Sequence, residues 1–165
     1  MNYKIIDNAL PQEEFNFIKE NILNSNFPWN LSTTITITNE EDVLPIHASF
    51  YFTHMFWEGF NPEPQSQMFA PLLNLMDCHA LMRIKANCYP STPEIIKHGK
   101  HADYSFPHKG AIFYVNTNNG LTILDDETEV ESIENRLLLF DSSKPHRSTT
   151  CTDTKCRINV NFNYF

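Results

Sequence analysis

Residues 11–24 carry apolar side chains at helical spacing, with Phe15, Ile18 and Ile22 on one face. Pro11 suits a first helical position, where a backbone N–H would have no partner, and the acidic residues that follow it favour the positive end of a helix dipole. The pattern therefore predicts a helix over 11–24 that packs on a sheet.

The next segments are rich in β-branched and aromatic residues. Residues 33–38 are Thr or Ile throughout, and residues 47–53 are β-branched or aromatic over much of their length. Such residues fit a pleated, half-buried surface, so both segments are predicted to be strands. Residues 39–42, which lie between them, are predicted to form an acidic, solvated loop.

A second helix is predicted after the stiff connector 61–64, which contains two prolines. Pro71 is tolerated only in the first turn of such a helix. The apolar side of the predicted helix consists of Leu72, Leu73, Met76 and Ala80.

From residue 81 onward the sequence shows only strand and turn signals. Many short strands with regular turns are typical of a sandwich or a barrel. The predicted strands span residues 81–89, 101–105, 111–116, 121–124, 135–140, 145–149 and 156–164.

The last of these strands has the clearest alternation. Its polar positions are Arg157, Asn159, Asn161 and Asn163, and its apolar positions are Ile158, Val160, Phe162 and Tyr164. A polar face directed to water would make an ordinary outer strand. A polar face directed into a barrel would line it with hydrogen-bonding groups and hold a polar ligand.

Composition limits the class of protein. The chain has 165 residues, 41% of them hydrophobic, and a formal net charge of −8, which fits one domain (1–165) with a real core. No apolar run approaches the roughly 20 residues that span a bilayer, and the N-terminus lacks a signal-peptide pattern, so we expect a cytoplasmic protein. The acidic balance argues against nucleic acid as a partner.

The strongest chemical feature is His101-Ala102-Asp103. Within a strand over 101–105, alternation would put both ligating side chains on the same face. His146 follows an apolar strand and a turn, which can bring it beside them. Two imidazoles and a carboxylate form the facial set of non-haem Fe(II) oxygenases. The alternative is that these are three unrelated polar surface residues.

Arg157 is the eleventh residue after His146 and lies on the polar face of the last predicted strand. A guanidinium in a confined site needs an anion, and its forked donors match a carboxylate. The position suggests a dicarboxylate cosubstrate, unless Arg157 is merely a surface arginine.

With these motifs in order, residues 81–165 resemble the Fe(II)- and 2-oxoglutarate-dependent dioxygenases, in particular the prolyl 4-hydroxylase-like branch with the hypoxia-sensing prolyl hydroxylases. The motifs that carry the resemblance are Cys88-Tyr89-Pro90, His101-x-Asp103, residues 113–116, residues 135–140 with Pro145-His146, and residues 157–160. The spacing from His146 to Arg157 is slightly longer than in the hypoxia-sensing enzymes. Asn159 also stands where some relatives use Ser.

The resemblance implies a mainly β fold with flanking helices, the double-stranded β-helix (jelly roll, cupin-like). Residues 1–80 would supply helices and supporting strands, and residues 81–165 the catalytic core. His101, Asp103 and His146 would hold Fe(II). Arg157, with Tyr114, Tyr89 and Asn159, would hold the far carboxylate of 2-oxoglutarate. O2 would be the second cosubstrate, with ascorbate as an optional reductant.

The implied function is hydroxylation of a C–H bond in a peptide or small-molecule substrate, foremost a peptidyl residue such as proline, with decarboxylation of 2-oxoglutarate to succinate and CO2. One alternative is a non-catalytic, cupin-like module that binds a metal or ligand. Another is a nucleobase-repairing oxygenase, which the charge of −8 disfavours. The N-terminal half offers no substrate-recognition motif that matches the family.

Several residues keep two interpretations. Tyr114 is either a core aromatic or a ligand contact, and the aromatic segment 50–60 either fills the core or lines a substrate groove. His98 and His108 are expected to be loop residues near the mouth of the site. The four cysteines, which include no CxxC pair, are interpreted as reduced thiols.

Overall fold

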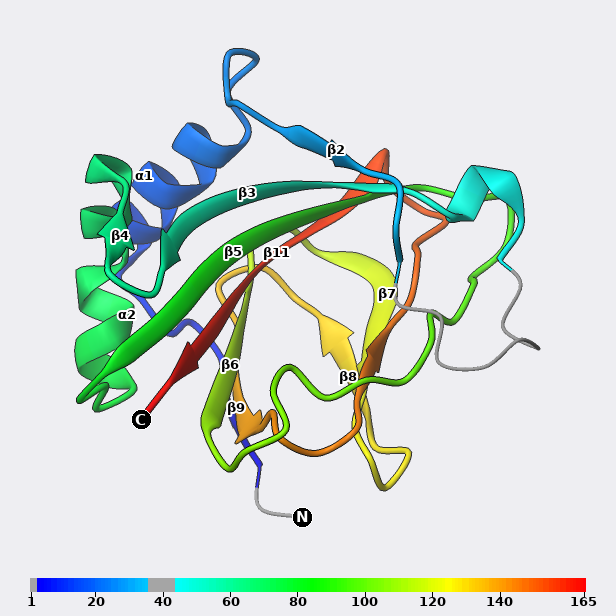
Figure 1. Ribbon diagram of the computed structural model, residues 1–165. Coiled ribbons are helices and arrows are strands. Elements are labelled where there is room, and N and C mark those ends of the chain that lie inside the picture. The colour runs from blue at the N-terminus through cyan, green and yellow to red at the C-terminus, as the bar shows by residue number, and fades with distance from the viewer. Residues whose placement is uncertain (1–2, 36–43) are drawn as a thin grey trace.

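The computed structural model describes residues 3–35 and 44–165. These residues form an eight-stranded antiparallel sheet with the order β1-β9-β6-β11-β5-β3-β2, in which β4 also pairs with β3, and a three-stranded sheet with the order β10-β7-β8 (Figure 1). The strands are β1 (Lys4–Ile6), β2 (Asn30–Ser32), β3 (Tyr51–Glu58), β4 (Asn61–Pro62), β5 (Leu81–Pro90), β6 (Lys109–Tyr114), β7 (Asn118–Ile123), β8 (Glu129–Ser132), β9 (Leu137–Asp141), β10 (Arg147–Ser148) and β11 (Cys156–Tyr164).

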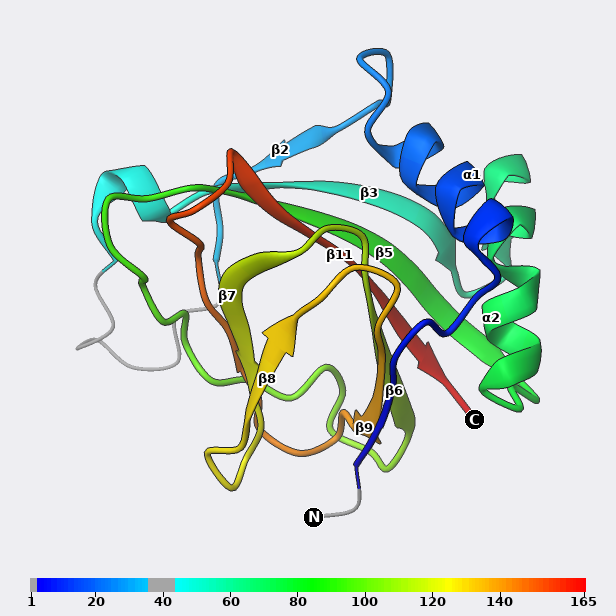
Figure 2. The same cartoon turned by 180° about the vertical axis from the view of Figure 1, so that it is seen from behind.

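Two α-helices lie together against the outer face of the large sheet (Figure 2). They are α1 (Gln12–Ile22) and α2 (Ala70–Leu75), and the 3-10 helices are η1 (Ile46–Ala48) and η2 (Pro64–Phe69). The arrangement confirms the predicted class, a mainly β jelly roll with flanking helices. No helix among the described residues is long and apolar enough to cross a bilayer.

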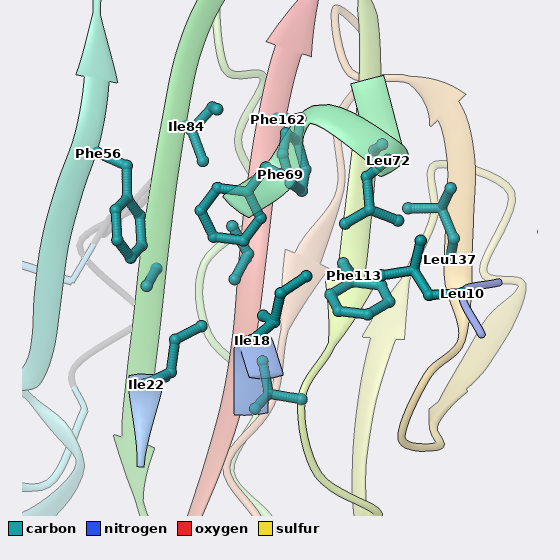
Figure 3. Close-up of a cluster of buried hydrophobic side chains, with 14 of the residues drawn as sticks. Leu10, Ile18, Ile22, Phe56, Phe69, Leu72, Ile84, Phe113, Leu137 and Phe162 are labelled. Carbon is teal, nitrogen blue, oxygen red and sulfur yellow. The ribbon is translucent and has the colours of Figure 1, made fainter. Parts of the chain in front are cut away.

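The main core fills the space between the helices and the large sheet (Figure 3). From α1 it receives Phe15, Ile18 and Ile22, the three residues that the helical spacing placed on one face. Side chains from the sheet, among them Phe113 and Phe162, meet them from the other side. Their burial is the main source of stability in this layer.

Strand β11 runs between β5 and β6 and has two buried faces. Its apolar positions, from Ile158 to Tyr164, belong to the core beneath the helices. Its polar positions, from Arg157 to Asn163, are also buried, and they face the interior between the two sheets. The polar face therefore lines the barrel, and the interpretation of an ordinary outer strand is wrong.

In the N-terminal half, strands form where a partner strand pairs with the segment, rather than wherever the residues have a high β-propensity. The strand predicted over 33–38 is displaced, because β2 ends at Ser32 and residues 33–35 lie outside it. Positions 36–38 and the predicted acidic loop 39–42 fall outside the described residues. The strand predicted over 47–53 begins only at Tyr51 and continues to Glu58, because β5 supplies partners from Phe52 onward.

In the C-terminal half, the strand predicted over 101–105 is wrong. His101 makes only an isolated bridge to His146, and Asp103 lies in a bend. Strand β8 was not predicted; it pairs with β7 next to it in the chain. The second helix is shorter than predicted and leaves Ala80 outside it.

We expect truncation of Phe162 to lower the stability of the fold strongly. Its side chain is fully buried and packs 5.5 Å, centroid to centroid, from Phe69. Phe162→Ala should lower the free energy of unfolding by roughly 3–5 kcal/mol, measured by urea denaturation. The matched control is Phe60→Ala, because Phe60 is 99% exposed, and it should change stability little. Equal effects of the two substitutions would contradict this description of the core.

Candidate metal centre and anion pocket

The structure brings His101, Asp103 and His146 together, and their ligating atoms all lie within 4.8 Å of one another. The Nε2 atoms of His101 and His146 each lie 3.9 Å from an oxygen of Asp103. The grouping does not arise from alternation along one strand. Instead, His101 and His146 exchange two backbone hydrogen bonds, of 2.9 and 2.8 Å, and the Asp103 N–H donates to the Ser142 carbonyl at 3.1 Å.

Both imidazoles are oriented with Nε2 toward the centre of this group. Nδ1 of His146 lies 3.0 Å from the Lys144 carbonyl, and Nδ1 of His101 lies 3.4 Å from the Gly99 carbonyl. A carbonyl can only accept, so each Nδ1 is the nitrogen that donates, and in a neutral imidazole this leaves the lone pair on Nε2. Burial, the largest influence, lowers the pKa of His146. A neutral imidazole of this kind is ready to ligate a metal.

The Asp103 carboxylate is fixed by three donors from two inner strands. Arg83 on β5 donates to Oδ1 at 2.9 Å, while the amides of Asn163 and Asn161 on β11 donate to Oδ2 at 2.8 and 3.3 Å. Burial alone would raise the pKa of Asp103, but Arg83, His146 and the Asn163 hydrogen bond outweigh it and bring the pKa to about 2. The carboxylate is therefore ionised and held in place.

Arg157 is fully buried between the two sheets. Its Nε donates to the Ser132 hydroxyl at 2.8 Å and its Nη2 donates to the Thr122 hydroxyl at 2.9 Å. Its Nη1 is buried without a partner in the structure. Burial lowers the pKa of Arg157. A buried cation with an unused donor is stabilised when an anion comes beside it.

The walls around Arg157 are shaped to hold its side chain. Its Cζ lies 5.7 Å from the ring of Tyr89 and 5.8 Å from the ring of Tyr114, within the range of cation–π attraction. A Cβ added at Gly120 would come within 2.5 Å of Arg157 Cδ. Glycine at this position therefore makes room for the guanidinium stem.

The other predicted cosubstrate contacts lie around this guanidinium. The Tyr114 hydroxyl donates to Thr122 at 2.8 Å, so it reaches Arg157 through that residue, and the Tyr114 ring belongs to a buried apolar cluster. The structure therefore places Tyr114 among the core aromatics, and its contact with the cosubstrate stays a prediction. The Asn159 side-chain oxygen accepts from Asn87 at 3.0 Å. Asn87 and Thr122 were not singled out from the sequence.

Tyr89 stacks on Tyr51, with ring centroids 5.1 Å apart and planes at 8°. Burial first and Tyr51 second raise the pKa of Tyr89 to about 12. Its phenol is therefore protonated at neutral pH and remains a hydrogen-bond donor.

Two adjoining cavities open beside the triad and share Asn87, Tyr89, His101, Ser148 and Asn161. The inner cavity, of about 40 Å³, also reaches Thr122, His146 and Asn159. The outer cavity, of about 70 Å³, also reaches Tyr51, Lys85, His98 and Asp103. A larger hollow of about 750 Å³ lies elsewhere, and its lining includes none of the three triad residues.

His98 and His108 lie in loops, as predicted, and both are buried. His98 lines the outer cavity, whereas His108 lines neither of the two cavities beside the triad. Nδ1 of His98 lies 2.7 Å from the Ser148 hydroxyl, and burial followed by the charges of Arg157 and His101 lowers the pKa of His98 to about 3. Nε2 of His108 lies 2.7 Å from the Ser142 hydroxyl and accepts from Asn163 at 3.2 Å. His108 therefore supports the residues behind Asp103.

The residues of the aromatic segment 50–60 lie in different environments. Phe56 is fully buried in the core, Tyr51 lines the outer cavity, and Phe60 is exposed. Neither the core nor the groove interpretation covers the whole segment. The four cysteines are free thiols.

Comparison with known proteins identifies the fold. No family model and no curated protein matches the chain. Among solved structures, the chain is similar to the viral collagen prolyl hydroxylase of Paramecium bursaria Chlorella virus-1, in complex with 2OG. The TM-score is 0.63 and the identity 12%, with 99% of this chain and 95% of that chain covered.

A second similar structure is a prolyl hydroxylase from Trichoplax adhaerens in complex with a hypoxia inducible factor peptide fragment. Its TM-score is 0.63 and its identity 16%, with 99% of this chain and 83% of that chain covered. A third is the non-heme alpha-ketoglutarate-dependent epimerase of nogalamycin biosynthesis, with a TM-score of 0.63, 10% identity and 99% and 77% covered. The chain therefore has the fold of the 2OG-Fe(II) oxygenases over nearly its whole length.

The Asp103 carboxyl predicts how the metal-free protein responds to acid. Its folded pKa, about 2, lies below the ordinary value of 3.8, so ionised Asp103 stabilises the fold above about pH 4, and this contribution disappears as pH falls toward 2. The lost contribution is roughly 2 kcal/mol. In urea denaturation with a chelator present, wild-type stability should fall more steeply over this range than that of Asp103→Asn.

The control for this measurement is Asp77→Asn, because the Asp77 side chain is 83% exposed. This substitution should leave the pH dependence of wild type nearly unchanged. Parallel curves for wild type and Asp103→Asn would show that the carboxyl is not held as described.

Proposed function

We propose that this chain is an Fe(II)- and 2-oxoglutarate-dependent dioxygenase that hydroxylates a C–H bond. The observation that carries the proposal is the buried Arg157 guanidinium. It has an unused donor, and Thr122, to which it donates, lines the same cavity as His101 and His146. A metal triad and a buried cation that is linked through Thr122 to a cavity beside that triad match a cosubstrate that chelates metal at one end and carries a carboxylate at the other.

The residues present fit the metal. Two imidazoles with Nε2 directed into the group and one ionised carboxylate form the set that suits non-haem Fe(II) and leaves open positions. When bound, iron and 2-oxoglutarate supply the oxidising chemistry, in which O2 is consumed and 2-oxoglutarate is decarboxylated to succinate and CO2. His101, Asp103 and His146 would hold the metal, and Arg83 with Asn163 would keep the carboxylate oriented.

The residues around Arg157 fit the cosubstrate. Ser132 and Thr122 fix the guanidinium from one side, which leaves Nη1 to donate to the far carboxylate of 2-oxoglutarate. Tyr114 orients Thr122, while Tyr89 and Asn159 line the space between the guanidinium and the triad. Because these groups are preorganised and shielded from water, little reorganisation is needed when the anion enters.

For the substrate, we propose a peptidyl residue such as proline. Support comes from the prolyl hydroxylases among the similar structures, one of which holds a peptide. The epimerase with the same fold shows that this scaffold also carries another reaction. The proposal therefore separates into the iron chemistry, which the triad and Arg157 support, and the substrate, which the outer cavity must select.

Removing a triad imidazole tests the iron chemistry. Purified protein reconstituted with Fe(II) under exclusion of air, then given 2-oxoglutarate and O2, should release succinate slowly even without substrate. His101→Ala and His146→Ala should each reduce this rate at least about 100-fold, because the metal loses one of its protein ligands. His79→Ala, at an exposed position, is the control. Wild type that binds 2-oxoglutarate but releases no succinate would instead be a non-catalytic binding module.

A substitution at Arg157 tests whether this residue binds the cosubstrate. Arg157→Lys keeps a positive charge but loses the forked donors, so the KM for 2-oxoglutarate should rise roughly 10- to 100-fold, the equivalent of one or two charged hydrogen bonds. Thermal unfolding of the variant checks that it folds. Lys155→Gln, an exposed change two residues earlier, should leave KM unchanged. An unaltered KM in a folded Arg157→Lys would remove the guanidinium from the site.

A further inference from the structure

A second cation, Lys85, lies in the outer cavity beside the triad. Strand β5 alternates apolar residues toward the core with Arg83, Lys85, Asn87 and Tyr89 toward the interior. Register places Lys85 between Asn161 of β11 and Met55 of β3. Lys85 lines the outer cavity together with His101 and Asp103, and neither Ser132 nor Thr122, the hydroxyl partners of Arg157, lines it.

Lys85 has no counter-ion among residues 3–35 and 44–165. The neighbouring cation, Arg83, is paired with Asp103 at 2.9 Å. None of the ion pairs in the described chain includes Lys85. Its Nζ lies 5.8 Å from the centre of the Tyr51 ring, and such a ring can stabilise a cation but cannot neutralise it.

Burial at this position disfavours the charged form of the Lys85 side chain. Burial first and Arg83 second lower the pKa of Lys85 to about 8, against the opposite influence of Asp103 and Glu58. Lys85 still carries its charge at neutral pH, in a chain whose net charge is −8. An unpaired cation facing a cavity in an acidic protein indicates that an anion is brought to it.

The charges of a site that holds metal and cosubstrate also indicate that Lys85 is available to an anion. Fe(II), the Asp103 carboxylate, doubly ionised 2-oxoglutarate and the Arg157 guanidinium together balance to zero. Arg83, which is paired with Asp103, and Lys85, which Glu58 also influences, are further positive charges beside this set. Arg83 is committed to Asp103, so Lys85 is the cation that remains available to an entering molecule.

We propose that Lys85 binds a carboxylate of the primary substrate and thereby selects acidic substrates. The inference rests on the proposed dioxygenase function. The carboxylate belongs either to a free amino acid or to an acidic side chain that flanks the reacting residue in a peptide. The outer cavity, of about 70 Å³, has room for a small group of this kind, and Tyr51 and Tyr89 form its aromatic wall.

The test uses pairs of compounds that differ only in charge. One pair is L-proline and L-prolinamide, and the other is a proline-containing peptide with a flanking Asp or Asn. With Fe(II), 2-oxoglutarate and air, wild type should form at least tenfold more succinate above its substrate-free rate with the acidic member of one pair. The pair that shows the difference identifies the source of the carboxylate.

The variants separate recognition from chemistry. Lys85→Gln should reduce the acid preference to within twofold and keep the substrate-free rate within twofold of wild type, whereas Lys85→Arg should retain the preference. The control is Lys109→Gln, because Lys109 is exposed and also lies over a tyrosine ring, at 5.7 Å from that of Tyr164. A preference that survives in Lys85→Gln, or equal stimulation by both members of each pair, overturns the inference.

Binding is measured separately from turnover. Calorimetry with Ni(II) in place of iron and without O2 should show at least tenfold tighter binding of the acidic member, and Lys85→Gln should abolish this difference. Equal or undetectable binding of both members in wild type counts against the carboxylate site. Loss of succinate formation with the binding difference intact counts instead against the dioxygenase function, so the two failures are distinguishable.

Discussion

The fold is organised around a permanent positive charge buried between two sheets. Desolvating a guanidinium is costly, and the cost is met only when nearly every donor has a partner. Arg157 receives hydroxyl acceptors from Ser132 and Thr122 on the small sheet, aromatic faces from Tyr89 and Tyr114, and space from Gly120. These contacts tie the small sheet to β11, and they leave the Nη1 donor without a hydrogen-bond partner among the described residues. The same arrangement that stabilises the buried charge therefore also creates the demand for an anionic ligand.

Strand β11 separates two environments that are chemically opposite. Its apolar side joins the core under α1 and α2, while its polar side supplies Arg157 at one end and Asn163 at the other. Since successive polar residues are two positions apart, one strand can hold an anion and orient the Asp103 carboxylate at the same time. The core on the opposite face keeps the strand rigid, which fixes the separation of the anion site and the triad. Packing and chemistry are thus linked through alternation within a single strand.

Sequence patterns predicted the structural features that depend on residues close together in the chain. The period of α1 and the alternation of β11 are read from residues that lie close together in the chain, and the structure has both. The jelly roll was implied by the family resemblance, and the structure has it too. The strand predicted over 101–105 failed because His101 and Asp103 are placed by backbone bonds to His146 and Ser142, some 40 residues away. Arg83 and Lys85 were overlooked, although β5 alternates as β11 does. Their alternation was hidden by long side chains that are ordinary on exposed strands, and only burial distinguishes the two cases.

The distribution of charge around the triad separates what the fold provides from what this chain adds. Structures with this fold include both prolyl hydroxylases and an epimerase, so the scaffold alone does not select a substrate. Selection must come from groups that face the open side of the triad, and β3 and β5 contribute those groups through Tyr51, Lys85 and Tyr89. Arg157 is fully buried between the two sheets, where in the proposed function it would bind the cosubstrate. Lys85 lines the outer cavity together with His101 and Asp103. The two cations can therefore recognise two different anions, because Arg157 is held by Ser132 and Thr122 between the sheets, whereas Lys85 lines the outer cavity.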